Sequence, residues 1–134
     1  MKKAKLLLVF LVIASLFTFA ACKNPDDGKV EDVVMTVSAQ EYSVEGKSLQ
    51  DYMDYLVGKG TLSYTMSGTM LASVNGVSNT TNSYWMLYTD DAENSDTSWG
   101  TIEKNGKTYA SAKFGVTDLP IKDGCTYILT YQTF

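Results

Sequence analysis

The chain contains no histidine, the residue that most often transfers protons in enzymes at neutral pH. A Ser-His-Asp triad, a Cys-His pair and a histidine zinc site are therefore all excluded. Cys125 is the remaining candidate nucleophile, but its nearest charged neighbour in the sequence is Asp123, whereas a reactive thiolate needs a cation beside it. We interpret Cys125 as a small buried hydrophobic side chain and predict that the protein is not an enzyme.

Carboxylates are the other groups capable of chemistry, and several of them gather in one polar loop. The acidic or amide side chains of this loop are Asp90, Asp91, Glu93, Asn94 and Asp96. Their spacing departs from that of a calcium-binding loop, because Ala92 occupies a ligand position. We interpret the segment as a solvated loop, with calcium binding at extracellular millimolar levels as the alternative.

Asp118 and Asp123 are the remaining candidates for a general acid and base. Such a pair needs a set separation within a cleft, and Asp123-Gly124 already has the composition of a turn. We therefore predict no catalytic residues, no metal site and no resident cofactor.

Aromatic side chains are the strongest candidates for contact with a ligand. The run Tyr84-Trp85-Met86-Leu87-Tyr88 could form an apolar platform for a flat ligand. Because alternate side chains of a strand face opposite sides, we expect Trp85, Leu87 or both to fill the core and Tyr88 to be the exposed contact. Trp99, at the end of the polar loop, either anchors a ligand or partner or pins its own loop to the fold.

The first 21 residues have the features of an export signal. Three lysines (Lys2, Lys3 and Lys5) precede a run of apolar and small residues over 6–21, and polar residues follow directly. That run is shorter than the roughly 20 residues of a membrane-spanning helix, so we predict a signal peptide. Residues 19–22, Phe-Ala-Ala-Cys, resemble a bacterial lipobox, which implies cleavage before Cys22 and lipid attachment to its thiol. The alternative is an ordinary cleaved signal that leaves Cys22 as a free thiol.

Removal of the signal changes the charge of the protein. Without the three lysines, 8 basic side chains face 15 acidic ones, a net charge of −7. Such a surface repels phosphate backbones, so we expect no nucleic-acid partner. Residues 22–29 are predicted to be the lipidated cysteine and a polar tether, and residues 30–134 a single domain. Two acyl chains would hold that domain durably on the extracytoplasmic face of the cell membrane.

The pattern of residues 46–60 predicts one helix. Ser48-Leu49-Gln50-Asp51 has the form of a capping box, in which the Ser48 hydroxyl accepts a free backbone N–H. The side chains that then share one apolar face are Leu49, Tyr52, Met53 and Leu56. Gly58 and Gly60 end the helix after about three turns, because glycine adopts the left-handed conformation easily.

Short strands are expected on both sides of this helix. The predicted ranges are 33–37, 42–44, 62–66, 70–74, 84–88 and 126–131. The first two are predicted to form a hairpin, Asn75-Gly76 to form a tight turn, and 101–110 to hold a hairpin about Asn105-Gly106. This order predicts an α+β fold in which a mixed sheet packs on a single amphipathic helix.

The order of these segments resembles the bacterial domain family named for its similarity to the C-terminal domain of transcobalamin and intrinsic factor. The segments that carry the resemblance are 46–51 (Gly-Lys-Ser-Leu-Gln-Asp), 73–77 (Ser-Val-Asn-Gly-Val), 83–88 (Ser-Tyr-Trp-Met-Leu-Tyr), 115–116 (Gly-Val), 121–124 (Ile-Lys-Asp-Gly) and 126–131 (Thr-Tyr-Ile-Leu-Thr-Tyr). Together they cover about 33–131. Cys125 departs from the acidic or polar residue expected after the Asp-Gly turn.

The resemblance implies a β-grasp-like domain, a sheet that curls around one helix, which in cobalamin carriers caps one face of the corrin ring. The implied ligand-binding residues are Tyr84, Trp85, Met86, Leu87 and Tyr88, with Phe114 and Gly115 before the last strand. The carriers enclose cobalamin with a second, helical domain, and we expect these 134 residues to supply no counterpart of it. We therefore expect a membrane-anchored, small-ligand-binding domain, with a corrinoid as the implied ligand and a partner protein or transporter as helper. The alternative is a surface protein-interaction or accessory module without a small-molecule ligand.

Overall fold

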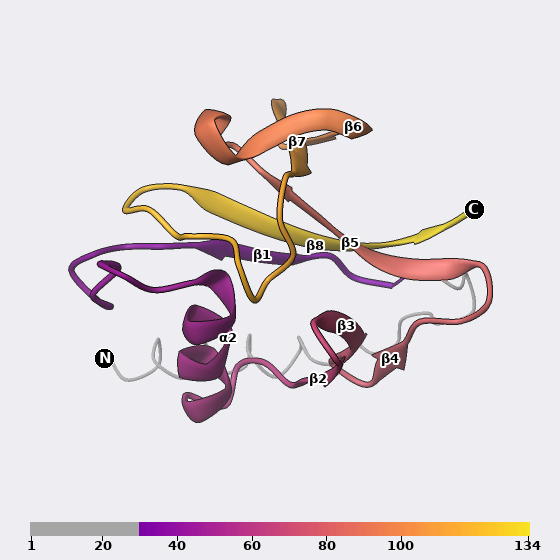
Figure 1. Ribbon diagram of the computed structural model, residues 1–134, viewed down its shortest axis with the longest axis horizontal. Helices are drawn as coiled ribbons and strands as arrows, with labels where there is room; N and C mark the ends of the chain where they lie inside the picture. The colour runs from indigo at the N-terminus through magenta and orange to yellow at the C-terminus, as the bar shows by residue number, and fades with distance from the viewer. Residues whose placement is uncertain (1–29) are drawn as a thin grey trace, which may run out of the picture. The chain divides into compact units, whose positions relative to one another are not determined.

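The computed structural model describes residues 30–134 (Figure 1). The predicted signal peptide (1–21), the lipid attachment at Cys22 and the tether (22–29) lie outside the described residues. The strands are β1 (Val33–Thr36), β2 (Tyr64–Ser67), β3 (Met70–Val74), β4 (Val77–Ser78), β5 (Ser83–Thr89), β6 (Ser95–Lys104), β7 (Lys107–Ala112) and β8 (Thr126–Thr133). They form a five-stranded sheet in the order β1-β8-β5-β7-β6 and a three-stranded sheet in the order β2-β3-β4.

Helix α2 (Leu49–Gly58) begins as the sequence predicts. Ser48 Oγ accepts the N–H of Asp51, and the Asp51 carboxylate accepts the N–H of Ser48 at 2.9 Å, so the capping box is complete. An N-cap of this kind stabilises a helix by about 1 kcal/mol. The buried side chains of the helix, Leu49, Tyr52 and Met53, belong to the predicted apolar face.

Helix α2 covers one face of the large sheet. The Tyr52 hydroxyl donates to the carbonyl of Thr36 in β1 at 3.4 Å. On the same face, Met35 lies opposite Tyr127 in the register of β1 and β8, and both side chains are buried. Figure 1 shows α2 and the small sheet on one side of β1, β8 and β5, with the β6–β7 hairpin on the other.

The predicted combination of sheet and one amphipathic helix is confirmed, but the predicted mixed sheet is wrong. Every pair of adjacent strands is antiparallel. The short connections within β2-β3-β4 and between β6 and β7 explain part of this result, because two-residue links can join only antiparallel strands.

The predicted hairpin between 33–37 and 42–44 is also wrong. Residues 42–44 form no strand, and β1 pairs instead with β8. The chain turns at once after β1, where the carbonyl of Ser38 accepts the N–H groups of Glu41 and Tyr42. Tyr42 then packs on helix α2, its ring centroid 4.8 Å from that of Tyr55, so its apolar character serves this contact and not a sheet.

Two tight turns are confirmed by their backbone angles. Asn75 and Gly76, between β3 and β4, have φ values of +50° and +86°. Asn105 and Gly106, between β6 and β7, have φ values of +53° and +80°. Positive φ at both central residues is the requirement of the hairpin turn that Asn-Gly favours. The predicted polar loop that holds Asp90 to Asp96 is shorter than expected, because β6 already begins at Ser95.

The second face of the large sheet has a small core of its own. Tyr88 of β5, Tyr109 of β7 and Ile128 of β8 are buried together, and Met86 and Ile102 pack against them. The β6–β7 hairpin closes over this cluster, so β5 lies between two apolar layers. This position explains why β5 is the most apolar strand in the sequence.

Candidate functional site

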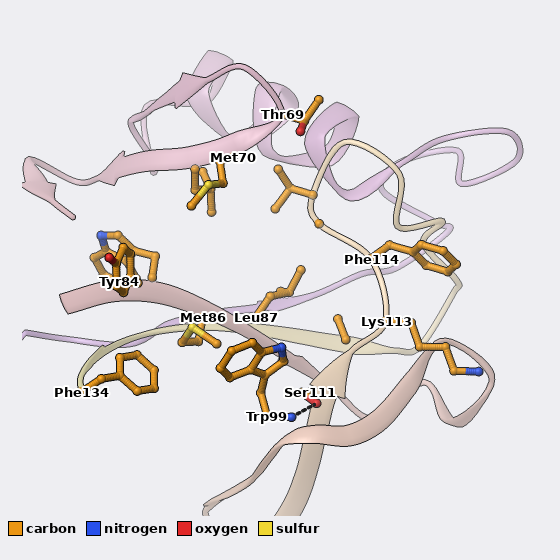
Figure 2. A pocket seen from close by; sticks show the side chains of 15 residues that line it. Thr69, Met70, Tyr84, Met86, Leu87, Trp99, Ser111, Lys113, Phe114 and Phe134 are labelled. Carbon is orange, nitrogen blue, oxygen red and sulfur yellow. Dashed lines mark hydrogen bonds between the residues drawn. The ribbon is translucent and has the colours of Figure 1, made fainter. Parts of the chain in front are cut away.

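Strand β5 carries the predicted aromatic run, and its two edges are paired unequally. It pairs with β8 along all of Ser83–Thr89, but with β7 only at Tyr88 and Thr89. The chain that follows β7 moves away from β5, and its Lys113 N–H donates to the carbonyl of Asn94 at 2.9 Å. A cavity opens on this side of β5 (Figure 2).

The cavity has a volume of about 820 Å³, within the range of small-molecule sites. Its lining comes from four parts of the chain, namely β3 with the residue before it, β5, Trp99 of β6, and the segment that runs from the end of β7 to Val116; the C-terminal Phe134 completes it. The structure thus brings together seven of the eight residues that the sequence singled out: Tyr84, Trp85, Met86, Leu87, Trp99, Phe114 and Gly115.

Exposed apolar side chains concentrate at this cavity. Residues 30–134 contain six large hydrophobic side chains with high exposure, and four of them line it: Met70, Trp99, Phe114 and Phe134. Trp99 is 63% exposed and Phe134 61%. Their ring centroids lie 6.4 Å apart in an edge-to-face arrangement. Large apolar surfaces left in water at one place are a feature of binding sites.

Trp85 forms part of the wall but is fixed in place. It is 8% exposed, and its indole N–H donates to the carbonyl of Val77 at 2.8 Å. Its ring lies against Tyr131 of β8, with centroids 5.2 Å apart. The expectation that Trp85 fills the core is confirmed, whereas Leu87 is half-buried. Trp85 therefore links the small sheet to β5 and makes this part of the cavity wall rigid.

The expectation that Tyr88 is the exposed contact is wrong. Tyr88 is 1% exposed, lies in the core beneath β6 and β7, and does not line the cavity. The cause is the pairing of β5 with β7 at this residue, which places Tyr88 under the hairpin. Its hydroxyl nevertheless donates to the backbone carbonyl of Trp99 at 2.9 Å, so it supports the site from below.

Trp99 is held in position by an irregularity of the β6–β7 ladder. The register passes from Asp96 opposite Ser111 directly to Thr101 opposite Ala110, so residues 97–100 form a bulge. Ser111 is buried, and its hydroxyl accepts the N–H of Trp99 at 3.1 Å and donates to the carbonyl of Asp96 at 2.9 Å. Of the two predicted roles for Trp99, the exposed side chain at the cavity favours ligand contact, because Ser111 and Tyr88 already hold the loop.

Sequence reasoning missed several residues of the lining, chiefly Met70, Leu71 and Phe134. Met70 and Leu71 lie in the small sheet, and the apolar run that they begin indicates only a strand. Phe134 follows two polar residues at the end of the chain, and its N–H donates to the carbonyl of Asn82 at 2.8 Å. The one sequence signal for these lining residues was the aromatic side chain of Phe134 directly after the polar Gln132 and Thr133.

The acidic loop is tied to the fold by ion pairs. Asp90 accepts the N–H of Thr126 at 2.9 Å and pairs with Lys107 at 2.7 Å, and Asp91 pairs with Lys122 at 3.1 Å. Burial works to raise the pKa of each aspartate, but the hydrogen bonds and nearby lysines outweigh it, and both pKa values lie below the ordinary value. The described residues hold no group of three or more His, Cys, Asp or Glu side chains placed to bind a metal ion.

The other residues considered for chemistry lie apart from the cavity lining. Asp123 accepts the N–H of Ala39 at 2.8 Å, which is a turn-forming role. Cys125 is half-buried, and burial raises the pKa of its thiol. Asp118 is exposed.

Comparisons with protein-family models, with curated proteins and with solved structures gave no match for this chain. In residues 30–134 there is no helix of the length and apolar character that crossing a membrane would require.

Proposed function

We propose that the protein is a membrane-anchored, extracytoplasmic domain that binds a small, largely apolar ligand without transforming it. The single observation that carries the proposal is the cavity of about 820 Å³ beside β5, rimmed by exposed apolar side chains. Burial of apolar area contributes roughly 25 cal/mol per Å², so a ligand that covers these side chains gains affinity from their removal from water. The concave shape favours a small ligand over the alternative of a flat protein-interaction surface.

The β-grasp-like assignment and the corrinoid ligand are the finer parts of this proposal. A sheet that packs on one helix supports the first. The second is supported by the resemblance in sequence and by the gathering of its implied contact residues, Tyr84 to Leu87 and Phe114 to Gly115, at one cavity. In the corrinoid version this domain covers one face of the ligand, and a partner protein or transporter covers the other.

Ligand binding is tested with the full chain in lipid nanodiscs and the aromatic probe anilinonaphthalene sulfonate. We expect saturable binding that falls about tenfold in Trp99→Ala. The matched control is Val57→Ala, an exposed apolar residue of α2 outside the cavity, which leaves binding unchanged. Equal binding by all three proteins, or by empty nanodiscs, would contradict the proposal.

The corrinoid version has its own test. Titration of the same sample with cobalamin and with cobinamide, followed by the visible spectrum and by calorimetry, is expected to give heat and a spectral shift. Neither signal at high micromolar concentration would remove the corrinoid while leaving the apolar site intact. The anchor is tested by Cys22→Ser, which is expected to release the protein from the membrane fraction.

A further inference from the structure

The backbone of β5 offers unpaired hydrogen-bonding groups to the cavity. Strand pairing shows which groups these are. Ser83 accepts the N–H of Thr80 through its carbonyl, and Trp85 donates its N–H to Asn79 Oδ1 at 3.0 Å. Neither partner belongs to β8, so the odd-numbered residues of β5 direct their backbone groups away from β8.

The same alternation assigns the direction of the next two groups. The carbonyl of Trp85 and the N–H of Leu87 lie on either side of Met86 and point to the β7 side of the strand. On that side β7 pairs only with Tyr88 and Thr89. Within residues 30–134, no strand pairs with the side of β5 away from β8 at Met86, so this carbonyl and this N–H face an open edge.

The open edge coincides with the cavity. Trp85, Met86 and Leu87 all line the cavity. The segment that leaves β7 at Ala112 lines its opposite side. Figure 2 shows Met70 on one side of β5 and Trp99 with Phe134 on the other, so apolar walls flank the edge. Backbone amides in an apolar site are costly to leave unpaired, and a ligand that supplies a matching donor and acceptor is favoured.

As the alternative to a corrinoid, we infer that the ligand of this site is a short, extended peptide with apolar side chains, which adds as a strand to β5 beside Met86; this inference rests on the proposed function. One N–H of the peptide donates to the carbonyl of Trp85, and one peptide carbonyl accepts the N–H of Leu87. The two open groups lie on Trp85 and Leu87, a stretch of three residues or about 10 Å at the usual rise of a strand, which suits a peptide of about three residues.

The two apolar walls of the cavity determine where the side chains of the peptide lie. Side chains of an added strand alternate between its two faces, so one set meets Met70 and Leu71 and the other meets Trp99 and Phe134. Apolar and aromatic side chains fit both positions. Backbone pairing gives affinity for any extended peptide, and these two walls give selectivity for apolar ones.

The test uses the tripeptide N-acetyl-Leu-Phe-Val-amide and the same peptide N-methylated at each residue in turn, with the full chain in nanodiscs. N-methylation replaces one N–H donor of the peptide with a methyl group and leaves the protein unchanged. We expect one methylated position to weaken binding about tenfold, while another changes it less than twofold. In ¹⁵N-labelled protein, we expect the Leu87 amide proton to shift downfield when the unmodified peptide binds.

Trp99→Ala separates the backbone contact from the apolar contact. This variant is expected to bind every peptide more weakly while keeping the ratio between the methylated and unmodified forms. Equal affinity for all methylated peptides, or an unmoved Leu87 amide, would overturn the inference. Binding of anilinonaphthalene sulfonate without any peptide binding would also overturn it and leave the proposed function standing, whereas binding of neither would remove both.

Discussion

The hydroxyl of Tyr88, buried in the core of the large sheet, donates a hydrogen bond of 2.9 Å to the backbone carbonyl of Trp99, whose side chain is 63% exposed at the cavity. Gln132 of β8 donates to the same hydroxyl at 3.2 Å. Tyr88 does not line the cavity, but its hydrogen bond fixes the position of the Trp99 backbone. The core of the β6–β7 side and the rim of the cavity are parts of one hydrogen-bonded unit.

Tyr88→Phe tests this connection. The variant keeps the ring that packs with Ile128 but removes the donor to Trp99, so we expect a loss of about 0.5–1.5 kcal/mol in the free energy of unfolding. A loss of 1 kcal/mol lowers the melting temperature by about 4–8 °C in a domain of this size. We also expect weaker binding of anilinonaphthalene sulfonate, because Trp99 is no longer held in place.

Tyr109→Phe is the matched control for that variant. Tyr109 belongs to the same buried cluster, and its hydroxyl forms no hydrogen bond with any described residue. The control is expected to change probe binding less than twofold. If Tyr88→Phe and Tyr109→Phe weaken binding equally, the hydrogen bond to Trp99 does not position the site.

The features that sequence predicted well are those decided within a few residues. Ser48 and Asp51 form their capping box because both groups lie in one turn of helix. Asn105 and Gly106 form their turn because both tolerate positive φ. Such patterns need no knowledge of the rest of the chain, and the structure reproduces them residue by residue.

The features that sequence did not predict depend on pairing between distant segments. Val33–Thr36 pairs with a strand at least 90 residues away, and no local pattern distinguishes that partner from the nearer 42–44. Tyr84 and Tyr88 belong to the same apolar run and have similar neighbours in the sequence. Only Tyr88 is covered by β7. The cavity residues Met70 and Phe134 were missed for the same reason, because their meeting depends on how the two sheets and the C-terminus are arranged.

The bulge that presents Trp99 depends on the buried hydroxyl of Ser111. Ser111→Ala removes an acceptor from the N–H of Trp99 and a donor from the carbonyl of Asp96, and it leaves both backbone groups unpaired. We expect a loss of about 1–3 kcal/mol in the free energy of unfolding. We also expect a change in the fluorescence maximum of Trp99, measured in a Trp85→Phe background so that only one tryptophan emits. An unchanged spectrum would show that other contacts hold the bulge.

The two tryptophans of the cavity are expected to differ in role, with Trp85 contributing to stability and Trp99 to ligand binding. Trp85 is 8% exposed and hydrogen-bonded to Val77, so Trp85→Ala is expected to cost about 3–5 kcal/mol in the free energy of unfolding. Trp99→Ala is expected to change stability by no more than about 0.5 kcal/mol while weakening ligand binding about tenfold. Urea unfolding and probe titration on both variants measure the difference. A large loss of stability in Trp99→Ala would mean that Trp99 serves the fold and not the ligand.

Stability at acid pH is expected to depend on Asp91, the buried carboxylate beside Lys122 and Asn94. Its pKa in the folded protein lies below the ordinary value of 3.8, because these partners outweigh the effect of burial. The unfolded chain therefore binds more protons than the folded one below about pH 4. The stabilisation from Asp91 is present above that pH and is lost as the pH falls through the lower pKa of the folded state.

Asp91→Asn tests this dependence, with the exposed Asp118→Asn as the matched control. At pH 7 we expect Asp91→Asn to melt at a lower temperature than the unmodified protein, and the difference to shrink as the pH falls below about 4, because protonation removes the charge of Asp91. The control is expected to follow the unmodified protein throughout. A difference in melting temperature that stays constant from pH 7 to 2.5 would show that Asp91 stabilises the loop through its shape and hydrogen bonds and not through its charge.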